Sequence, residues 1–227
     1  MGTVIVRHPG QMEYGRALRA MQSFTEKRTP ETPDEIWLLE HHPVFTLGAA
    51  EDASHLLATH SIPVVRSDRG GNVTYHAPGQ VVAYLLFDIH RAGISLLRDL
   101  VYRVEEVLIH LLLAYDLHGV RRPGAPGIYM DARANYGVWQ GAKIAAIGMK
   151  VNRKGYLYHG FSLNVSMDLQ AFSWIHPCGH AELQSVDMRT LGVTLPVDTV
   201  MRALVPLLCQ QFGVSACFPD NALEQIQ

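Results

Sequence analysis

The side chains of this 227-residue chain that could do chemistry begin with one cysteine. Cys178 stands in the run Ser173-Trp-Ile-His-Pro-Cys-Gly-His180, where proline and glycine set a turn, whereas Cys209 and Cys217 have apolar neighbours. A thiol attacks as its thiolate, and a nearby cation raises the ionised fraction. Cys178 is therefore a candidate nucleophile, and a buried structural thiol is the alternative interpretation.

A lysine interrupts the apolar stretch Gly141-Ala-Lys-Ile-Ala-Ala-Ile-Gly148. A lysine in a buried strand either gives up its proton more readily or pairs with an anion, and both make Lys143 useful beside a thiolate. The alternative is a lysine at a strand end whose ammonium reaches water. His159, directly before Gly160, is either an orienting residue of the same site or an ordinary strand histidine.

Metal binding is a competing interpretation for the histidines around the cysteine. Zinc accepts both histidine and cysteine, so His176, Cys178 and His180 could be ligands. Structural zinc sites usually draw their ligands from two separated pairs, and the sequence has no second pair of the right kind. We therefore expect no metal site.

The stretch from Arg69 to Gln80, Arg-Gly-Gly-Asn-Val-Thr-Tyr-His-Ala-Pro-Gly-Gln, has a composition that no ordinary fold element requires. Its glycine pair allows a close approach of the backbone to a ligand, and its Pro-Gly forces a turn. The residues between them favour extended chain. The stretch predicts a loop, a short strand and a second loop that carry Arg69, His76 and Gln80, with a hairpin and a surface histidine as the alternative.

Composition places the chain among ordinary globular proteins. It is 48% hydrophobic and 18% charged, with a formal net charge of -2 and a pI near 6.6, so no general electrostatic attraction to nucleic acid or anionic membranes is expected. Three cysteines without a Cys-x-x-Cys spacing argue against a disulfide framework and favour a reducing cytoplasm. No apolar run reaches the length of a membrane span and no export signal is present, so we expect a cytoplasmic protein.

Periodicity and turn residues predict one α+β domain over residues 1–227. The expected strands are 3–6, 36–40, 44–47, 63–66, 81–89, 128–130 and 156–165, with two more around a Gln140-Gly141 turn within 137–151. The expected helices are 11–28, 53–59, 95–115 and 196–212. The strand at 81–89 is a nearly continuous apolar run, which indicates burial on both faces. The apolar stripe of the 95–115 helix is expected to be core.

Several of these segments together resemble one family. The sequence is similar to the lipoyl(octanoyl) transferases in the stretch 69–80, in Gly141-Ala-Lys-Ile-Ala-Ala-Ile-Gly148, in His159-Gly-Phe-Ser-Leu-Asn-Val165 and in Pro177-Cys-Gly179, in that order and spacing. The chain departs from the family at Ala77, where glycine is usual, and at Asn72. These departures bear on which acyl chain is preferred, and less on the class of reaction that the resemblance implies.

The resemblance implies a fold, an activity and a site. The fold is the mixed sheet covered by helices of lipoate and biotin protein ligase catalytic domains. Cys178 and Lys143 would be catalytic. The acyl group would be bound by Arg69, Gly70, Gly71, Asn72, Val73, Thr74, Tyr75, His76, Ala146, Ile147, Gly148, Gly160, Phe161 and Ser162, with His159 as an orienting residue. No cofactor is implied.

The implied reaction moves an octanoyl or lipoyl group from acyl carrier protein to one lysine of a lipoyl domain, through a thioester on Cys178. The acceptors would be lipoyl domains of 2-oxoacid dehydrogenase E2 subunits and the glycine cleavage H protein, and the enzyme would be a monomer. Thioester exchange followed by amide formation needs no ATP, and the sequence has no Gly-x-x-x-x-Gly-Lys-Ser/Thr loop for its phosphates. The alternatives are an ATP-dependent lipoate ligase and a protein that only binds acylated carrier domains.

Overall fold

The strands of the chain form two sheets. The computed structural model describes residues 2–49, 54–176 and 183–219. Within these residues an eight-stranded sheet has the order β11-β1-β2-β6-β10-β9-β8-β7, and a three-stranded sheet has the order β4-β3-β5. The strands are β1 (Gly2–Met12), β2 (Asp34–His41), β3 (Val44–Leu47), β4 (Val64–Arg66), β5 (Thr74–His76), β6 (Gln80–Leu86), β7 (Gly119–Val120), β8 (Gly127–Met130), β9 (Lys143–Val151), β10 (Leu157–Asn164) and β11 (Val214–Cys217). β1 pairs in parallel with β2 and β11, and the other pairs of the large sheet are antiparallel.

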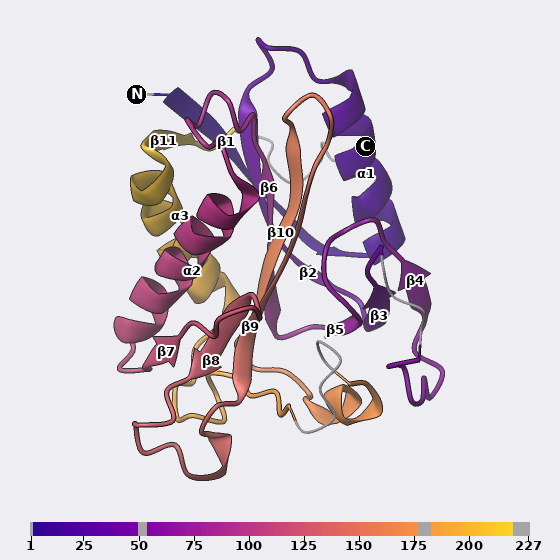
Figure 1. Ribbon diagram of the computed structural model, residues 1–227, viewed down its shortest axis with the longest axis vertical. Helices are drawn as coiled ribbons and strands as arrows, with labels where there is room; N and C mark the ends of the chain where they lie inside the picture. Colours follow the sequence, from indigo (N-terminus) through magenta and orange to yellow (C-terminus); the bar gives the residue numbers. More distant parts are fainter. Residues whose placement is uncertain (1, 50–53, 177–182, 220–227) are drawn as a thin grey trace.

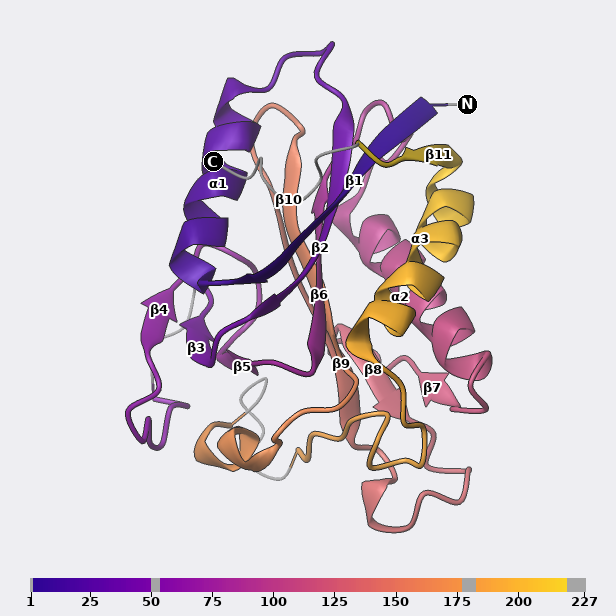
Figure 2. The same ribbon diagram turned by 180° about the vertical axis from the view of Figure 1, so that it is seen from behind.

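Helices cover both faces of the large sheet. They are α1 (Tyr14–Lys27), α2 (Leu97–Leu113) and α3 (Val197–Phe212), with short 3-10 helices η1 (Gly137–Trp139) and η2 (Gln170–Trp174). Figures 1 and 2 show α2 and α3 against one face and α1 against the other. The predicted α+β fold with a mixed, helix-covered sheet is confirmed. Among the described residues, none of these helices is both long and apolar enough to cross a membrane.

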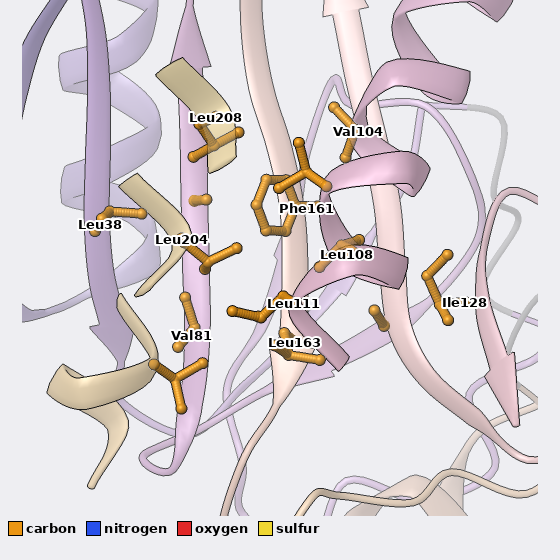
Figure 3. Packing of buried hydrophobic residues seen from close by; sticks show 14 of the residues in the cluster. Leu38, Val81, Val104, Leu108, Leu111, Ile128, Phe161, Leu163, Leu204 and Leu208 are labelled. Atoms are coloured by element: carbon orange, nitrogen blue, oxygen red, sulfur yellow. The ribbon is translucent and has the colours of Figure 1, made fainter. Parts of the chain in front are cut away.

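Strand β6 is buried on both faces, as its apolar run predicted. Successive residues of a strand face opposite sides of a sheet. Accordingly, Val81, Ala83 and Leu85 join the core under α2 and α3 (Figure 3), and Val82, Tyr84 and Leu86 join the cluster under α1. The large sheet is therefore the middle layer of three.

Helix α2 supplies most of its stripe to the core. Leu100, Val104, Leu108 and Leu111 are buried, as expected. The first turn differs, because Leu97 is 49% exposed and lines a cavity together with Val101. The prediction that the whole stripe is core was wrong at this end, since Leu97 and Val101 line the cavity.

Three local predictions were also wrong. The described residues 54–59 form a turn, an isolated bridge and irregular chain rather than a helix, since Leu56 bridges to Ile175 and the Leu57 N–H donates to the Trp174 carbonyl. The segment expected as a strand at 137–140 contains η1 instead. Strand β1 also continues past its expected end, because a register shift between Arg7 and Gly10 absorbs the proline between them.

Candidate active site

A cavity of about 430 Å³ lies where β9 and β10 face the loop that follows β4. Its wall is made of small residues in register: Ala146 lies opposite Ser162, and Gly148 lies opposite Gly160. The predicted residues that line it are Arg69, Gly70, Gly71, Asn72, Val73, Thr74, His76, Lys143, Ala146, Ile147, Gly148, His159, Gly160, Phe161 and Ser162. Segments that are distant in the sequence thus meet at one cavity, and small side chains leave room for an unbranched ligand.

Tyr75 is the exception among the described binding residues that were predicted. Strand alternation in β5 directs it away from the cavity that its neighbours line. Its ring packs 5.3 Å from that of Phe45 and 5.6 Å from that of Phe172, in the apolar cluster beside the small sheet. Tyr75 therefore lies outside the wall of this cavity.

The two departures from the family pattern have different surroundings. Ala77 is 3% exposed and packs into the same apolar cluster as Tyr75, outside the cavity wall. Asn72 lines the cavity. Of the two, Asn72 is the residue in a position to affect a ligand directly.

Hydrogen bonds from Arg69 hold the loop that covers the cavity in place. Arg69 is buried, and its Nη2 donates at 2.7 Å to both the carbonyl and the hydroxyl of Thr46. The loop also crosses strand β3 closely: a Cβ on Gly48 would lie 1.7 Å from the Gly71 carbonyl oxygen. Only glycine fits at position 48 with the loop in this place.

Hydrogen bonds to the Asp68 carboxylate fix the start of the same loop. Its carboxylate accepts hydrogen bonds from Tyr158 Oη at 2.5 Å, His159 Nε2 at 2.8 Å and Lys150 Nζ at 3.1 Å. Burial opposes the charged form, but these donors together hold the pKa of Asp68 well below its usual value. The charge therefore lies within a network that ties the loop to β9 and β10.

His159 lies at the far end of the cavity from Lys143. Its partner across the ladder, Met149, follows Lys143 by six residues along β9, a separation of about 20 Å at roughly 3.3 Å per residue. Its backbone has φ of 61°, a strained value for a residue other than glycine. Burial lowers the pKa of His159 although Asp68 opposes the effect. The residue can orient the covering loop, through Asp68, but it cannot orient Lys143.

Burial disfavours the charged form of two further histidines: His76, which lines the cavity, and His41, which packs against it. His76 Nδ1 lies 2.7 Å from Gln80 Oε1, and the Gln80 amide donates to Asn164 Oδ1. His41 lies edge-on to His76, with 5.6 Å between ring centroids. Burial lowers the pKa of His41 to about 4 and that of His76 well below its usual value. These two histidines therefore contribute polar groups without a positive charge.

Several lining residues were missed from the sequence. They are Tyr14, Gln80, Val82, Tyr84, Leu97, Val101, Gly124, Ala125, Pro126, Ile144, Ala145, Met149, Asn164, Phe172 and Ser185. Gln80 and Asn164 belong to the segments that carry the resemblance, so a local signal existed for them. Tyr14 and Tyr84 had none, because a tyrosine in an amphipathic helix or a buried strand is indistinguishable from core until the chain folds.

Lys143 lies at the start of β9 and is 6% exposed. Its Nζ donates to the Pro126 carbonyl oxygen at 3.1 Å and lies 5.2 Å from the centroid of the Tyr129 ring. Its backbone N–H donates to the carbonyl of Gln184, and the neighbouring Ser185 lines the cavity. The chain that follows residues 177–182 therefore runs directly beside Lys143.

Cys178 and His180 lie outside the described residues. His176 is described and its N–H donates to the His55 carbonyl. In the parts of the chain that the structure covers, no group of three or more histidine, cysteine or acidic side chains is arranged to hold a metal ion. The metal interpretation of the 176–180 segment stays untested.

Comparisons with known proteins place the chain in a family. Residues 13–208 match the model of the lipoyl protein ligase A/B catalytic domain. An octanoyltransferase of Paraburkholderia phytofirmans is 53% identical over 204 residues, which cover 89% of this chain and 84% of that protein. A lipoate-protein ligase A bound with ATP has a similar fold at 15% identity, with a TM-score of 0.71, over 99% of this chain and 92% of that one. A biotin protein ligase from Aquifex aeolicus is similar at a TM-score of 0.52 and 6% identity, over 93% of this chain and 70% of that one. The chain therefore belongs to the lipoyl protein ligase A/B catalytic domain family and, within it, to the octanoyltransferases, which are acyltransferases.

Proposed function

We propose that this enzyme transfers an octanoyl or lipoyl group from acyl carrier protein to a lysine of lipoyl domains, through a thioester on Cys178. One observation carries the proposal: Lys143 stands at one end of a cavity walled by small residues, beside the chain that follows the Cys178 segment. The names of relatives at about half identity support the same acyl group. The acceptors would be lipoyl domains of 2-oxoacid dehydrogenase E2 subunits and the glycine cleavage H protein. The enzyme would act as a cytoplasmic monomer of one domain.

The first half-reaction exchanges one thioester for another. The Cys178 thiolate attacks the donor carbonyl, the tetrahedral intermediate collapses, and the carrier leaves as a thiolate that takes up a proton. The acyl chain would lie along the wall formed by Ala146, Gly148, Gly160 and Ser162. Because one thioester replaces another, the acyl group stays activated and no ATP is consumed.

The second half-reaction forms an amide. The incoming lysine is protonated in solution and must lose a proton before it attacks the Cys178 thioester. Lys143 lines the cavity beside Gln184 and Ser185, in the chain that follows the Cys178 segment, and its amino group can take that proton. The cysteine leaves as a thiolate and the amide product is more stable than the thioester, so transfer runs forward.

An acyl-enzyme measurement tests the proposal. Purified protein is incubated with octanoyl acyl carrier protein without ATP, and intact mass and a peptide map are recorded. We expect one octanoyl adduct on Cys178 that disappears when a lipoyl domain is added. Cys178→Ser should form no adduct and Lys143→Ala should slow both half-reactions. The matched control is Cys217→Ser, which removes an exposed thiol at the distant strand β11 and should keep full activity.

The alternatives predict other results. Transfer that requires ATP and free octanoate would replace this mechanism with a ligase mechanism. Tight binding of the carrier without any mass change would indicate a binding protein. Full transfer by Cys178→Ser would contradict the acyl-enzyme route whatever the cofactor requirement.

A further inference from the structure

The carbonyl that receives the Lys143 hydrogen bond belongs to a peptide group with a second strong contact. Lys143 Nζ donates at 3.1 Å to the carbonyl oxygen of Pro126. The N–H on the other side of that peptide bond belongs to Gly127, and it donates at 3.1 Å to Glu105 Oε1. A peptide group is planar and rigid, so the position of its N–H determines the position of its oxygen. Glu105 therefore determines where the Lys143 acceptor lies.

Glu105 is held firmly enough for this task. It lies in α2 and is 6% exposed, and its second oxygen accepts from Arg121 Nε at 3.0 Å. An ionised carboxylate makes stronger hydrogen bonds to N–H groups than a neutral acceptor does. Its negative charge also polarises the peptide group, which makes the Pro126 oxygen a better acceptor for an ammonium group.

The peptide group also leaves Lys143 little freedom. A Cβ at Gly127 would lie 2.7 Å from Lys143 Cε and 2.5 Å from the Ala145 carbonyl oxygen, so backbone and lysine side chain are in direct contact. The Tyr129 ring lies near the amino group from a second direction. A shift of the 126–127 peptide would therefore move the lysine side chain with it.

We propose that Glu105 is a positioning residue for Lys143, which acts through the Pro126–Gly127 peptide group. The consequence for acyl transfer rests on the proposed function, but the effect on Lys143 itself does not. Loss of the carboxylate frees the Gly127 N–H, the peptide rotates, and Lys143 loses its acceptor. Arg121 is a support for the carboxylate and has no bond to the peptide group of its own.

The test measures the reactivity of Lys143 directly. Folded protein is treated with a trace of acetic anhydride across a pH series, and peptide mass spectrometry gives the acetylation of Lys143 relative to exposed Lys154. Glu105→Ala and Glu105→Asp remove the bond to Gly127, the second while keeping the charge. We expect both to raise the relative reactivity of Lys143 by roughly fivefold, the equivalent of one lost hydrogen bond. Glu105→Gln keeps an acceptor and should stay within about twofold of the parent.

Transfer kinetics supply the second measurement. In Glu105→Asp and Glu105→Ala the turnover number should fall by about 10-fold to about 100-fold, with KM for the acyl donor nearly unchanged, because a misplaced catalytic group costs rate more than binding. The matched control is Glu106→Gln, which changes the neighbouring carboxylate on Arg121, leaves the Glu105 bonds to Arg121 and Gly127, and should stay near the parent in both measurements. Glu105→Asp keeps a buried acceptor, so it still gives a result if Glu105→Ala does not fold.

Either measurement can overturn the inference. Parental Lys143 reactivity in folded Glu105→Asp would show that the carboxylate does not place the lysine. Equal damage from Glu105→Gln and Glu105→Ala would show that charge, and not the bond to Gly127, is what matters. If acyl transfer is absent from the parent enzyme as well, the proposed function fails, while the reactivity series still decides the role of Glu105.

Discussion

His41 should make the stability of this protein depend steeply on pH. The residue is fully buried, with Nδ1 2.9 Å from the Met12 carbonyl oxygen and Nε2 2.6 Å from Tyr84 Oη. A carbonyl can only accept, so Nδ1 carries the hydrogen of the neutral ring and Nε2 accepts from the tyrosine. Both ring nitrogens are thus satisfied in the neutral form, and burial lowers the pKa to about 4.

The sign of the effect follows from proton uptake. In the unfolded chain the imidazole has its ordinary pKa of 6.5, whereas in the folded protein the pKa is about 4. Between these values the unfolded state binds a proton that the folded state does not, so stability falls as the pH is lowered. Going from about pH 7.5 to about pH 4.5, this one group costs about 2.5 kcal/mol of the free energy of unfolding.

The perturbation is His41→Gln, whose amide has a donor and an acceptor but takes up no proton. At about pH 7.5 we expect the free energy of unfolding of the variant to be about 1 kcal/mol lower than that of the parent, because the glutamine amide makes one of the hydrogen bonds imperfectly. At about pH 4.5 the order should reverse, leaving the variant more stable by about 1.5 kcal/mol, since it lacks the proton-linked loss. Urea unfolding at both pH values measures the difference, and effects of other groups largely cancel between the two proteins.

His42→Gln is the matched control, because the neighbouring imidazole is exposed. Its free energy of unfolding should stay within about 0.5 kcal/mol of the parent value at both pH values. The reasoning would be refuted if the difference between parent and His41→Gln were the same at the two pH values. That result would mean that the folded protein protonates His41 as readily as the unfolded chain does.

Two glycines of the cavity wall give further predictions. In Gly148→Ala the new Cβ would lie 2.9 Å from the Gly70 carbonyl oxygen and 3.2 Å from Arg69 Cδ, so the covering loop must shift. KM for an octanoyl donor should rise roughly 10-fold with a smaller change for a butanoyl donor, and an equal change for both chain lengths would contradict this. In Gly160→Ala the Cβ would meet the Ala83 carbonyl oxygen at 2.0 Å, a backbone atom that cannot move without breaking the β6–β10 pairing. Urea unfolding should show a loss of about 3 kcal/mol, and a loss under about 0.5 kcal/mol would show that the sheet yields more easily than its packing indicates.

The cavity wall could be predicted from the sequence where local chemistry is unusual. Gly70 and Gly71, the small residues from Ala146 to Gly148, and Gly160 to Ser162 stand out because ordinary strands and loops have no need of them. Tyr75 belongs to the same run but packs against Phe45 and Phe172, a contact that a motif does not reveal. A motif identifies a segment, and the packing of the folded chain decides which of its residues line the cavity.

Other residues could not be predicted, because pairing across the fold defines their surroundings. His41 and His42 are adjacent and chemically identical in the sequence, yet one is fully buried against Tyr84 and the other is exposed. Glu105 belongs to the polar side of an amphipathic pattern, which predicts a solvated carboxylate. It is buried because the chain returns in β8 and brings the Gly127 N–H to it.

The charged groups at both ends of the cavity are bonded to its wall, and this arrangement fits an alkyl chain that carries one reactive carbonyl. At one end the Lys143 amino group rests on a peptide group fixed by Glu105. At the other end the Asp68 carboxylate accepts hydrogen bonds from Tyr158 and His159, and the Arg69 guanidinium donates to Thr46. A charge without such a partner beside the end of an alkyl chain would lose hydration without compensation, and binding would weaken.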